Sequence, residues 1–254
     1  ERTRRTVFFV GAGASAEVGM PLWAQLKENL FTEIDKHTVV LNEGDPTTRS
    51  FRKLEALRNS NESYWDFFET AELGWPTVYE DFMEREFDEK ISRVSVPTIY
   101  ERIWGMRHVR QVLTLNVDML LTAAFNSVVG KSGERLLEYD GFSLADSFPY
   151  FSRDNYVVAN LHGTYSEKSR WIMSERQRKN LYDGALGDRY KRFIERVFSE
   201  YNVVFVGLNT SDIAICKALL DCPLPQPKYA TLGRTKGTKG GFIQSSERCE
   251  WTKN

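Results

Sequence analysis

Short and nearly unbroken apolar runs are the feature that most constrains the fold of this chain. They lie at 7–10, 111–115, 156–161, 203–206 and 227–232. Strands with one face in water alternate apolar and polar residues, whereas strands buried on both faces of a parallel sheet read as continuous apolar runs. The sequence therefore predicts a parallel sheet that is covered on both sides.

Helical patterns lie between these runs. Apolar residues recur at three- and four-residue spacings over 22–34 and again over 190–201. Strands that alternate with helices are typical of a doubly wound α/β fold. A length of 254 residues suits one large domain or two small ones. We therefore expect 1–254 to form a single domain around a Rossmann-like sheet.

The stretch 48–106 interrupts this alternation. It is charged and aromatic, has helical spacing and contains no strand-like run. We interpret it as a helical insertion that packs over one end of the sheet. Such a layer either forms the wall of a pocket or simply covers the core, and both alternatives remain open at this point.

Composition argues against several classes of protein. The net charge is −1 with a pI of about 6.4, so direct binding of nucleic acid is not expected. No run of 18 apolar residues and no signal-peptide pattern occurs, so we expect a cytoplasmic protein without a membrane partner. The glycine- and lysine-rich stretch 233–241 is typical of a loop.

The cysteines predict neither a metal site nor a disulfide framework. There are three, an odd number, and none forms a CxxC pair: Cys216, Cys222 and Cys249. We therefore expect no bound metal. The first strand-like run begins almost at residue 1, so we expect the chain to be trimmed or to be part of a longer protein.

A glycine-rich turn follows the first strand-like run. Gly11, Gly13 and Ala16 satisfy the pattern GxGxx(G/A) between a strand and a helical stretch. Glycines there let the backbone approach a pyrophosphate, and the start of the helix supplies free N–H groups. Ser15 would add a hydroxyl at the helix start. The alternative is a tight packing turn without a ligand.

The same pattern occurs in dehydrogenases, which hold the ribose with an acidic residue at the end of a second strand. Glu33 and Asp35 stand at about the right distance, but both lie in the helical stretch 22–37. No strand precedes them. This argues against an ordinary hydride-transfer domain.

Three further strand-like runs end in polar or glycine residues. Asn116 and Asp118 follow the second run, and His162 follows the third. Gly207, Asn209 and Asp212 follow the fourth. The carboxyl ends of parallel strands lie along one edge of a sheet, where ligands bind. We therefore expect these residues to converge with the glycine turn on one crevice.

These motifs resemble those of the sirtuin family, and specifically its bacterial sirtuin-like NAD-hydrolase branch. The resemblance covers most of the chain in the right order. It rests on a glycine-alanine-glycine turn, a threonine-x-asparagine-x-aspartate motif, a leucine-histidine-glycine motif and a late glycine after an apolar strand. The residues are Gly11, Ala12, Gly13, Ser15, Gly19, Met20, Pro21, Thr114, Asn116, Asp118, Leu161, His162, Gly163 and Gly207.

The sequence also departs from the protein-deacylating sirtuins. Leu22, Trp23 and Ala24 stand where those enzymes carry aspartate, phenylalanine and arginine, and Leu115 replaces a glutamine. No cysteine lies between His162 and Gly207, so the zinc ribbon of that branch is absent. The resemblance therefore implies the NAD-cleaving part alone, as in the sirtuin-like effectors that deplete NAD during anti-phage defence.

For the chemistry, the resemblance implies an NAD+ glycohydrolase (NADase) that splits the nicotinamide–ribose bond of its substrate NAD. We expect His162 to act as general base, because imidazole titrates near neutral pH. We expect Asn116 to position the ribose or water, and Asp118 to orient or stabilise nearby groups. The predicted NAD-binding residues are Gly11, Ala12, Gly13, Ser15, Pro21, Trp23, Gly207, Asn209 and Asp212, with Trp23 beside the nicotinamide and Asn209 near the adenosine half.

Structural roles are the alternatives for the same residues. His162 is then a buried, hydrogen-bonded histidine, and Trp23 belongs to the core. Asn116 and Asp118 then cap the apolar stretch 119–128, and Asp212 caps a helix over 213–220. A cap and a functional role are compatible for Asn116 and Asp118.

The function has alternatives as well. One is a non-catalytic module that senses NAD or ADP-ribose, and a second is an NAD-dependent protein deacylase, against which the missing zinc ribbon argues. Plain hydrolysis and cyclisation of ADP-ribose begin with the same bond cleavage and stay open. By family analogy we expect activity to depend on a homo-oligomer, a regulatory sensor domain or a partner protein.

Overall fold

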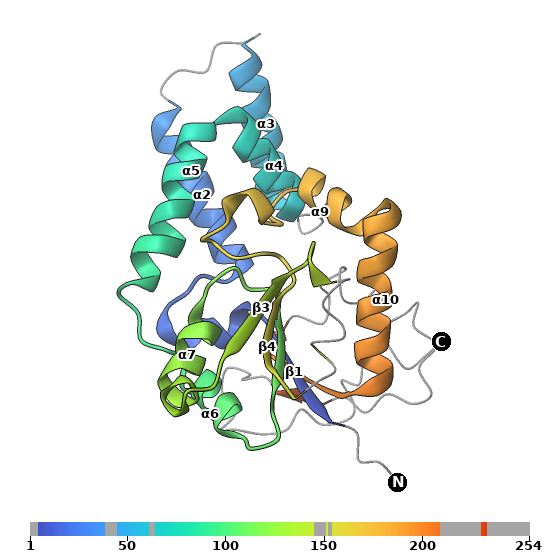
Figure 1. The fold of residues 1–254 in the computed structure, drawn as a ribbon. Coiled ribbons are helices and arrows are strands. Elements are labelled where there is room, and N and C mark those ends of the chain that lie inside the picture. The colour runs from blue at the N-terminus through green and yellow to red at the C-terminus, as the bar shows by residue number, and fades with distance from the viewer. Residues whose placement is uncertain are drawn as a thin grey trace.

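A six-stranded parallel sheet forms the centre of the protein (Figure 1). The computed structural model describes residues 5–38, 45–60, 64–144, 151, 154–208 and 230–232. The strand order is β3-β4-β2-β1-β5-β6, and all adjacent pairs are parallel. The strands are β1 (Thr6–Val10), β2 (Gln111–Thr114), β3 (Leu136–Asp140), β4 (Tyr156–Asn160), β5 (Asn202–Val206) and β6 (Ala230–Leu232). The Rossmann-like α/β fold expected from the sequence is confirmed.

One strand was not predicted. β3 has the sequence LLEYD, and all but one of its residues are half-buried, the other being exposed. It pairs only with β4 and so forms an edge of the sheet. A short half-polar edge strand carries neither a continuous apolar run nor a long alternation, which explains why the pattern did not reveal it. Of the predicted run 227–232, only 230–232 lies within the described residues, where it forms β6.

Two apolar clusters cover the two faces of the sheet. Successive residues of β1 point to opposite sides, so Phe8 and Val10 join one cluster while Val7 and Phe9 join the other. Every residue of β4 is buried. Burial on both faces is the physical reason for the unbroken apolar runs.

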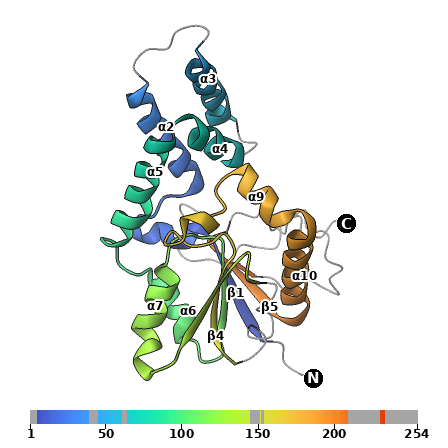
Figure 2. The ribbon, with the colours of Figure 1, turned by 45° about the horizontal axis from the view of Figure 1, so that its top comes forward.

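Helices supply much of both clusters. They are α1 (Ala12–Ser15), α2 (Trp23–His37), α3 (Pro46–Asn59), α4 (Tyr64–Gly74), α5 (Pro76–Glu84), α6 (Thr98–Gly105), α7 (Leu120–Val128), α9 (Glu175–Tyr182) and α10 (Gly184–Glu200). α6 and α7 lie beside one face of the sheet and α10 beside the other, whereas α2, α3, α4 and α5 extend beyond one end (Figures 1 and 2).

Most of the described chain from 46 to 105 is helical, with a turn and loop at 92–97 before α6. A π-helical turn (Arg85–Glu89) continues α5. This stretch overlaps the proposed insertion 48–106, whose status as a separate unit stays a prediction. None of the helices in the described part of the chain is long and apolar enough to cross a membrane.

Polar contacts join α4 to α9 and α2 to the end of α3. Glu69 on α4 accepts a hydrogen bond from the backbone amide of Arg176 at the start of α9, at 2.8 Å. The ammonium of Lys27 on α2 donates to the carbonyls of Arg58 (2.7 Å), in the last turn of α3, and of Ser60 (3.1 Å), just after it. The contact of Glu69 matters because α4 also carries Trp65, which lies against the predicted catalytic histidine.

Candidate functional site

The predicted site lies at the carboxyl ends of the strands. β2 adjoins one side of β1 and β5 adjoins the other, so the direction of winding reverses at β1. In open α/β sheets, ligands bind in the crevice at such a switch point. The loops after β1, β2, β4 and β5 carry the residues that the sequence singled out.

The glycine turn packs directly against the end of β5. The amide of Gly11 donates to the carbonyl of Val206 and that of Gly13 to the carbonyl of Gly207, both at 2.9 Å. A Cβ atom on Gly13 would lie 2.8 Å from the Gly207 carbonyl oxygen. These glycines thus allow two loops to approach closely, and their two amides are not free to bind a phosphate. The ligand-binding roles of Gly11, Ala12, Gly13 and Gly207 stay predictions.

The helix after this turn is shorter than the pattern suggested. α1 has four residues and is followed by a 3-10 turn (Ala16–Val18) and by Gly19 at a φ of 90°. The long helix α2 begins only at Trp23. A four-residue helix offers little dipole to an anion, so the pyrophosphate argument from the sequence loses much of its support.

A buried polar cluster joins three elements that lie far apart in the sequence. The Ser15 hydroxyl donates to Asp118 Oδ2 at 2.8 Å and lies 2.7 Å from the Tyr100 hydroxyl oxygen. Asn116 Nδ2 donates to Ser15 Oγ and to the Tyr100 oxygen, both at 3.1 Å. All four residues are buried. We refer to Ser15, Tyr100, Asn116 and Asp118 as the polar cluster.

Local contacts with the backbone hold Asn116 and Asp118 in place. The amide of Asn116 donates to Thr114 Oγ1 at 2.9 Å, and the amide of Leu120 donates to Asp118 Oδ1 at 3.1 Å. Asp118 therefore also satisfies an amide at the start of α7, as the alternative structural interpretation proposed. Because Leu120 occupies Oδ1, Oδ2 remains for Ser15. Asp118 therefore bonds the start of α7 and belongs to the polar cluster at the same time.

Burial dominates the electrostatics of the polar cluster. It raises the pKa of Asp118, while the hydrogen bonds from Ser15, Leu120 and Asn116 oppose that rise. Burial together with the nearby Asp118 raises the pKa of the Tyr100 phenol well above its usual range. Tyr100 therefore stays protonated and can donate its single proton to Ser15.

A small pocket opens beside the polar cluster. Trp23 and Pro21 lie on its wall together with Ser15, Asn116 and Asp118. The other lining residues are Ala12, Met20, Leu26, Phe87, Leu115 and Val117. The pocket thus combines a mostly apolar wall with a few convergent polar groups, which is the usual composition of a small-molecule site.

His162 lies apart from this pocket, beneath an aromatic layer. Its side chain is 1% exposed, and its ring centroid lies 5.4 Å from that of Trp65, which in turn contacts Trp23 at 5.7 Å. Nε2 lies 3.1 Å from the Tyr182 hydroxyl, and Nδ1 is buried without a hydrogen-bond partner. His162 is not one of the described residues that line the pocket.

Enclosure of His162 predicts a specific pH dependence of stability. Burial lowers its pKa to about 3, whereas an unfolded histidine titrates near about 6.5. Between these values only the unfolded chain binds the proton. The contribution of neutral His162 to the free energy of unfolding is therefore complete above the pKa of the unfolded histidine. It is lost as the pH falls toward 3, by up to about 1.4 kcal/mol per pH unit.

Denaturant unfolding of the wild type and of His162→Gln between about pH 7 and pH 5 measures this effect. We expect the free energy of unfolding of the wild type to fall more steeply with acidity than that of the variant. Equal slopes would show that His162 is hydrated in the folded protein.

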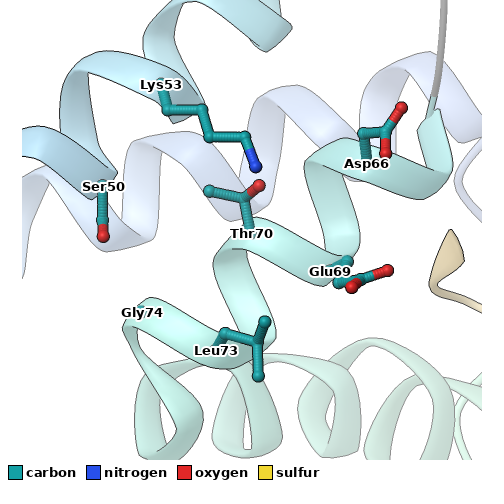
Figure 3. A pocket seen from close by; sticks show the side chains of 7 residues that line it. All are labelled: Ser50, Lys53, Asp66, Glu69, Thr70, Leu73 and Gly74. Carbon is teal, nitrogen blue, oxygen red and sulfur yellow. The ribbon is translucent and has the colours of Figure 1, made fainter. Parts of the chain in front are cut away.

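A second pocket lies between α3 and α4, away from the strand ends (Figure 3). Asp66 and Glu69 line it, together with Ser50, Lys53, Thr70, Leu73 and Gly74. Two carboxylates beside one lysine do not suit a pyrophosphate. This pocket is therefore not a candidate for the dinucleotide.

The structure brings together only some of the predicted residues. Ser15, Asn116 and Asp118 meet in the polar cluster, and Ala12, Pro21 and Trp23 line the adjoining pocket. Trp23 also packs on Trp65, so its core and pocket roles coexist. Asn209 and Asp212 lie outside the described residues, as do the three cysteines and the stretch 233–241. Within the described part, no group of three potential metal ligands occurs.

Sequence reasoning missed Tyr100. It lies on α6 in the stretch TIYERIWG, where its spacing with Ile103 and Trp104 indicates only an apolar helix face. Nothing in that pattern reveals that its hydroxyl reaches two loops on other strands.

One family model matches the chain. Residues 110–222 match the family described as SIR2-like domain. The matched segment includes Asn116, Asp118, His162 and Gly207, whereas the glycine turn and Tyr100 precede it. A search of curated proteins finds no match.

Proposed function

Because the chain carries a SIR2-like domain over residues 110–222, we propose that it binds NAD and hydrolyses the nicotinamide–ribose bond. SIR2-like domains are associated with NAD-dependent activity at the level of the family. The products would be nicotinamide and ADP-ribose or a cyclic form of it. NAD is the substrate in this proposal, and no metal takes part.

The polar cluster beside its pocket is the observation that carries this proposal. Cleavage passes through a state in which positive charge grows on the ribose, and nicotinamide leaves as a neutral base. The site therefore needs to orient the sugar and stabilise positive charge, and it needs no acid for the leaving group. Asn116 supplies an oriented amide, and Asp118 supplies a buried carboxyl group whose ionised form favours that charge.

In this proposal the pocket walls hold the nicotinamide half of the substrate. Trp23 would flank the nicotinamide, with Pro21 and Ala12 on the same wall. Ser15 would act through its contacts to Asn116 and Asp118. Asn209 and Asp212 remain proposed contacts of the adenosine half.

His162 would be the general base for water or a ribose hydroxyl. Its buried Nδ1 has no partner, so one nitrogen is available for a proton once it is accessible. Trp65 is half-buried and covers the ring. Displacement of Trp65 would hydrate the imidazole and return its pKa toward neutrality, where it becomes an effective base.

A non-catalytic sensor of NAD or ADP-ribose is the second candidate. The enclosure of His162 favours it, because an imidazole whose pKa burial lowers to about 3 is a weak base at neutral pH. The two candidates make different demands. The sensor needs the pocket alone, whereas the hydrolase needs a state in which His162 is exposed.

Biologically, we propose an effector that depletes NAD in anti-phage defence and that acts in the cytoplasm. Its activity would be gated by homo-oligomerisation, a sensor domain or a partner protein, since unregulated hydrolysis would harm the host cell. Turnover that is constitutive and independent of protein concentration would contradict this gating.

Incubation with NAD tests the two candidates. Nicotinamide release and the ADP-ribose products are followed by chromatography over a range of protein concentrations, with and without an acylated lysine peptide. Release without the peptide supports the hydrolase, and a requirement for the peptide indicates a deacylase. NAD binding without release in every assembly state supports the sensor.

A further inference from the structure

The Tyr100 hydroxyl is the one member of the polar cluster that comes from the predicted insertion 48–106. Tyr100 is fully buried on α6, which packs beside α7 (Figure 1). It lies 85 positions after Ser15 and 16 before Asn116, yet it contacts both. No other described hydroxyl group bridges these two side chains.

The direction of the hydrogen bonds follows from counting protons. Ser15 has one hydroxyl proton, and Asp118 accepts it. Ser15 Oγ therefore accepts a hydrogen bond from the Tyr100 hydroxyl, which uses the only proton of that hydroxyl. The Tyr100 oxygen is then free to accept from Asn116 Nδ2. The chain of donors runs from Tyr100 through Ser15 to Asp118.

This arrangement determines how the Asn116 side chain lies. Its amide nitrogen has two protons, and their acceptors are Ser15 Oγ and the Tyr100 oxygen. Both protons of the amide are thus taken up within the polar cluster. The carbonyl Oδ1 is consequently the part of Asn116 that is left for a ligand in the pocket, and a carbonyl oxygen accepts hydrogen bonds from sugar hydroxyls.

We propose that Tyr100 is a positioning residue, whose hydroxyl holds the Asn116 amide so that Oδ1 faces the ligand. The proposal rests on the proposed NAD chemistry for its effect on rate, but the orientation of Asn116 is independent of it. Without the hydroxyl, the amide loses one of its acceptors and can rotate more freely about its Cβ–Cγ bond. The ring of Tyr100 would still fill its place in the core.

Tyr100→Phe tests this directly because it removes only the oxygen. We expect kcat for nicotinamide release to fall by roughly 10- to 100-fold with KM within about threefold, since a misdirected group costs rate more than binding. Tyr79→Phe is the matched control: Tyr79 is also buried, on α5, but belongs to no described contact of the polar cluster. Its kcat should stay within about twofold of the wild type.

A second readout does not depend on activity. With asparagine labelled by 15N, the Asn116 side-chain protons are assigned by their loss in Asn116→Ala. We expect them to exchange slowly with solvent in the wild type and in Tyr79→Phe, and at least about tenfold faster in Tyr100→Phe.

The two readouts separate the proposals. Unchanged exchange of the Asn116 protons in a folded Tyr100→Phe protein overturns the positioning role, whatever the activity. A wild type that releases no nicotinamide in any assembly state overturns the hydrolase, while faster exchange in Tyr100→Phe still supports the positioning role. Unchanged kcat in an active Tyr100→Phe protein overturns the claim that positioning matters for the reaction.

Discussion

Asn116→Ala is expected to lower nicotinamide release by roughly 100- to 1,000-fold while the protein stays folded. Asn116 lines the pocket, and its side-chain amide donates hydrogen bonds to Ser15 and to Tyr100. Alanine removes the group that we propose to orient the ribose, and it leaves Ser15 and Tyr100 bonded to each other. The measurement is the initial rate of nicotinamide release at saturating NAD.

Gln111→Ala is the matched control for this loss. Gln111 is also a buried side-chain amide, but it lies at the opposite end of β2 and donates to the carbonyl of Asn155. Its loss should lower stability and leave the rate within about twofold. If both variants lose activity equally, the effect of Asn116→Ala reflects damage to the strand. If neither does, the proposed site is wrong.

Gly207→Ala is expected to lower the free energy of unfolding by more than about 3 kcal/mol. Gly207 has a φ of 64°, and a Cβ atom there would lie 2.2 Å from the backbone nitrogen of Ala14 and 2.7 Å from the carbonyl carbon of Gly13. Both contacts are with backbone, so relief requires the glycine turn to move away from β5. The measurement is chemical denaturation of the wild type and the variant.

Gly133→Ala separates the cost of the left-handed backbone conformation from the cost of the close contact with the glycine turn. Gly133 has a φ of 81°, but no atom lies within 4 Å of its Cβ position. It therefore has the backbone strain alone, which costs about 1–2 kcal/mol. A similar loss in both variants would show that the approach of the two loops contributes little to stability.

The parallel sheet was predictable because strands buried on both faces require apolar residues at every position. β1, β2, β4 and β5 were therefore visible in the sequence to within one residue or so at each end. β3 was not, because an edge strand tolerates polar residues such as Glu138 and Asp140. The pattern detects burial, and β3 is only half-buried.

The candidate site was only partly predictable. Residues that directly follow parallel strands share one edge of the sheet, which is why Ser15, Asn116 and Asp118 were expected to meet. The same rule also selected His162, yet the structure places Trp65 over it. That contact depends on how α4 docks on the sheet, and no local pattern encodes the docking of a helix.

The amino-acid sequence by itself determined the alternation of strands and helices and the set of polar residues at the strand ends, because both follow from local periodicity and the geometry of parallel sheets. Tertiary structure alone decided that Tyr100 completes the polar cluster, that the glycine amides bind β5 and that His162 is enclosed. These features arise from contacts between side chains or loops that lie tens to hundreds of positions apart. Their energy depends on how whole elements pack, and packing is a property of the assembled chain.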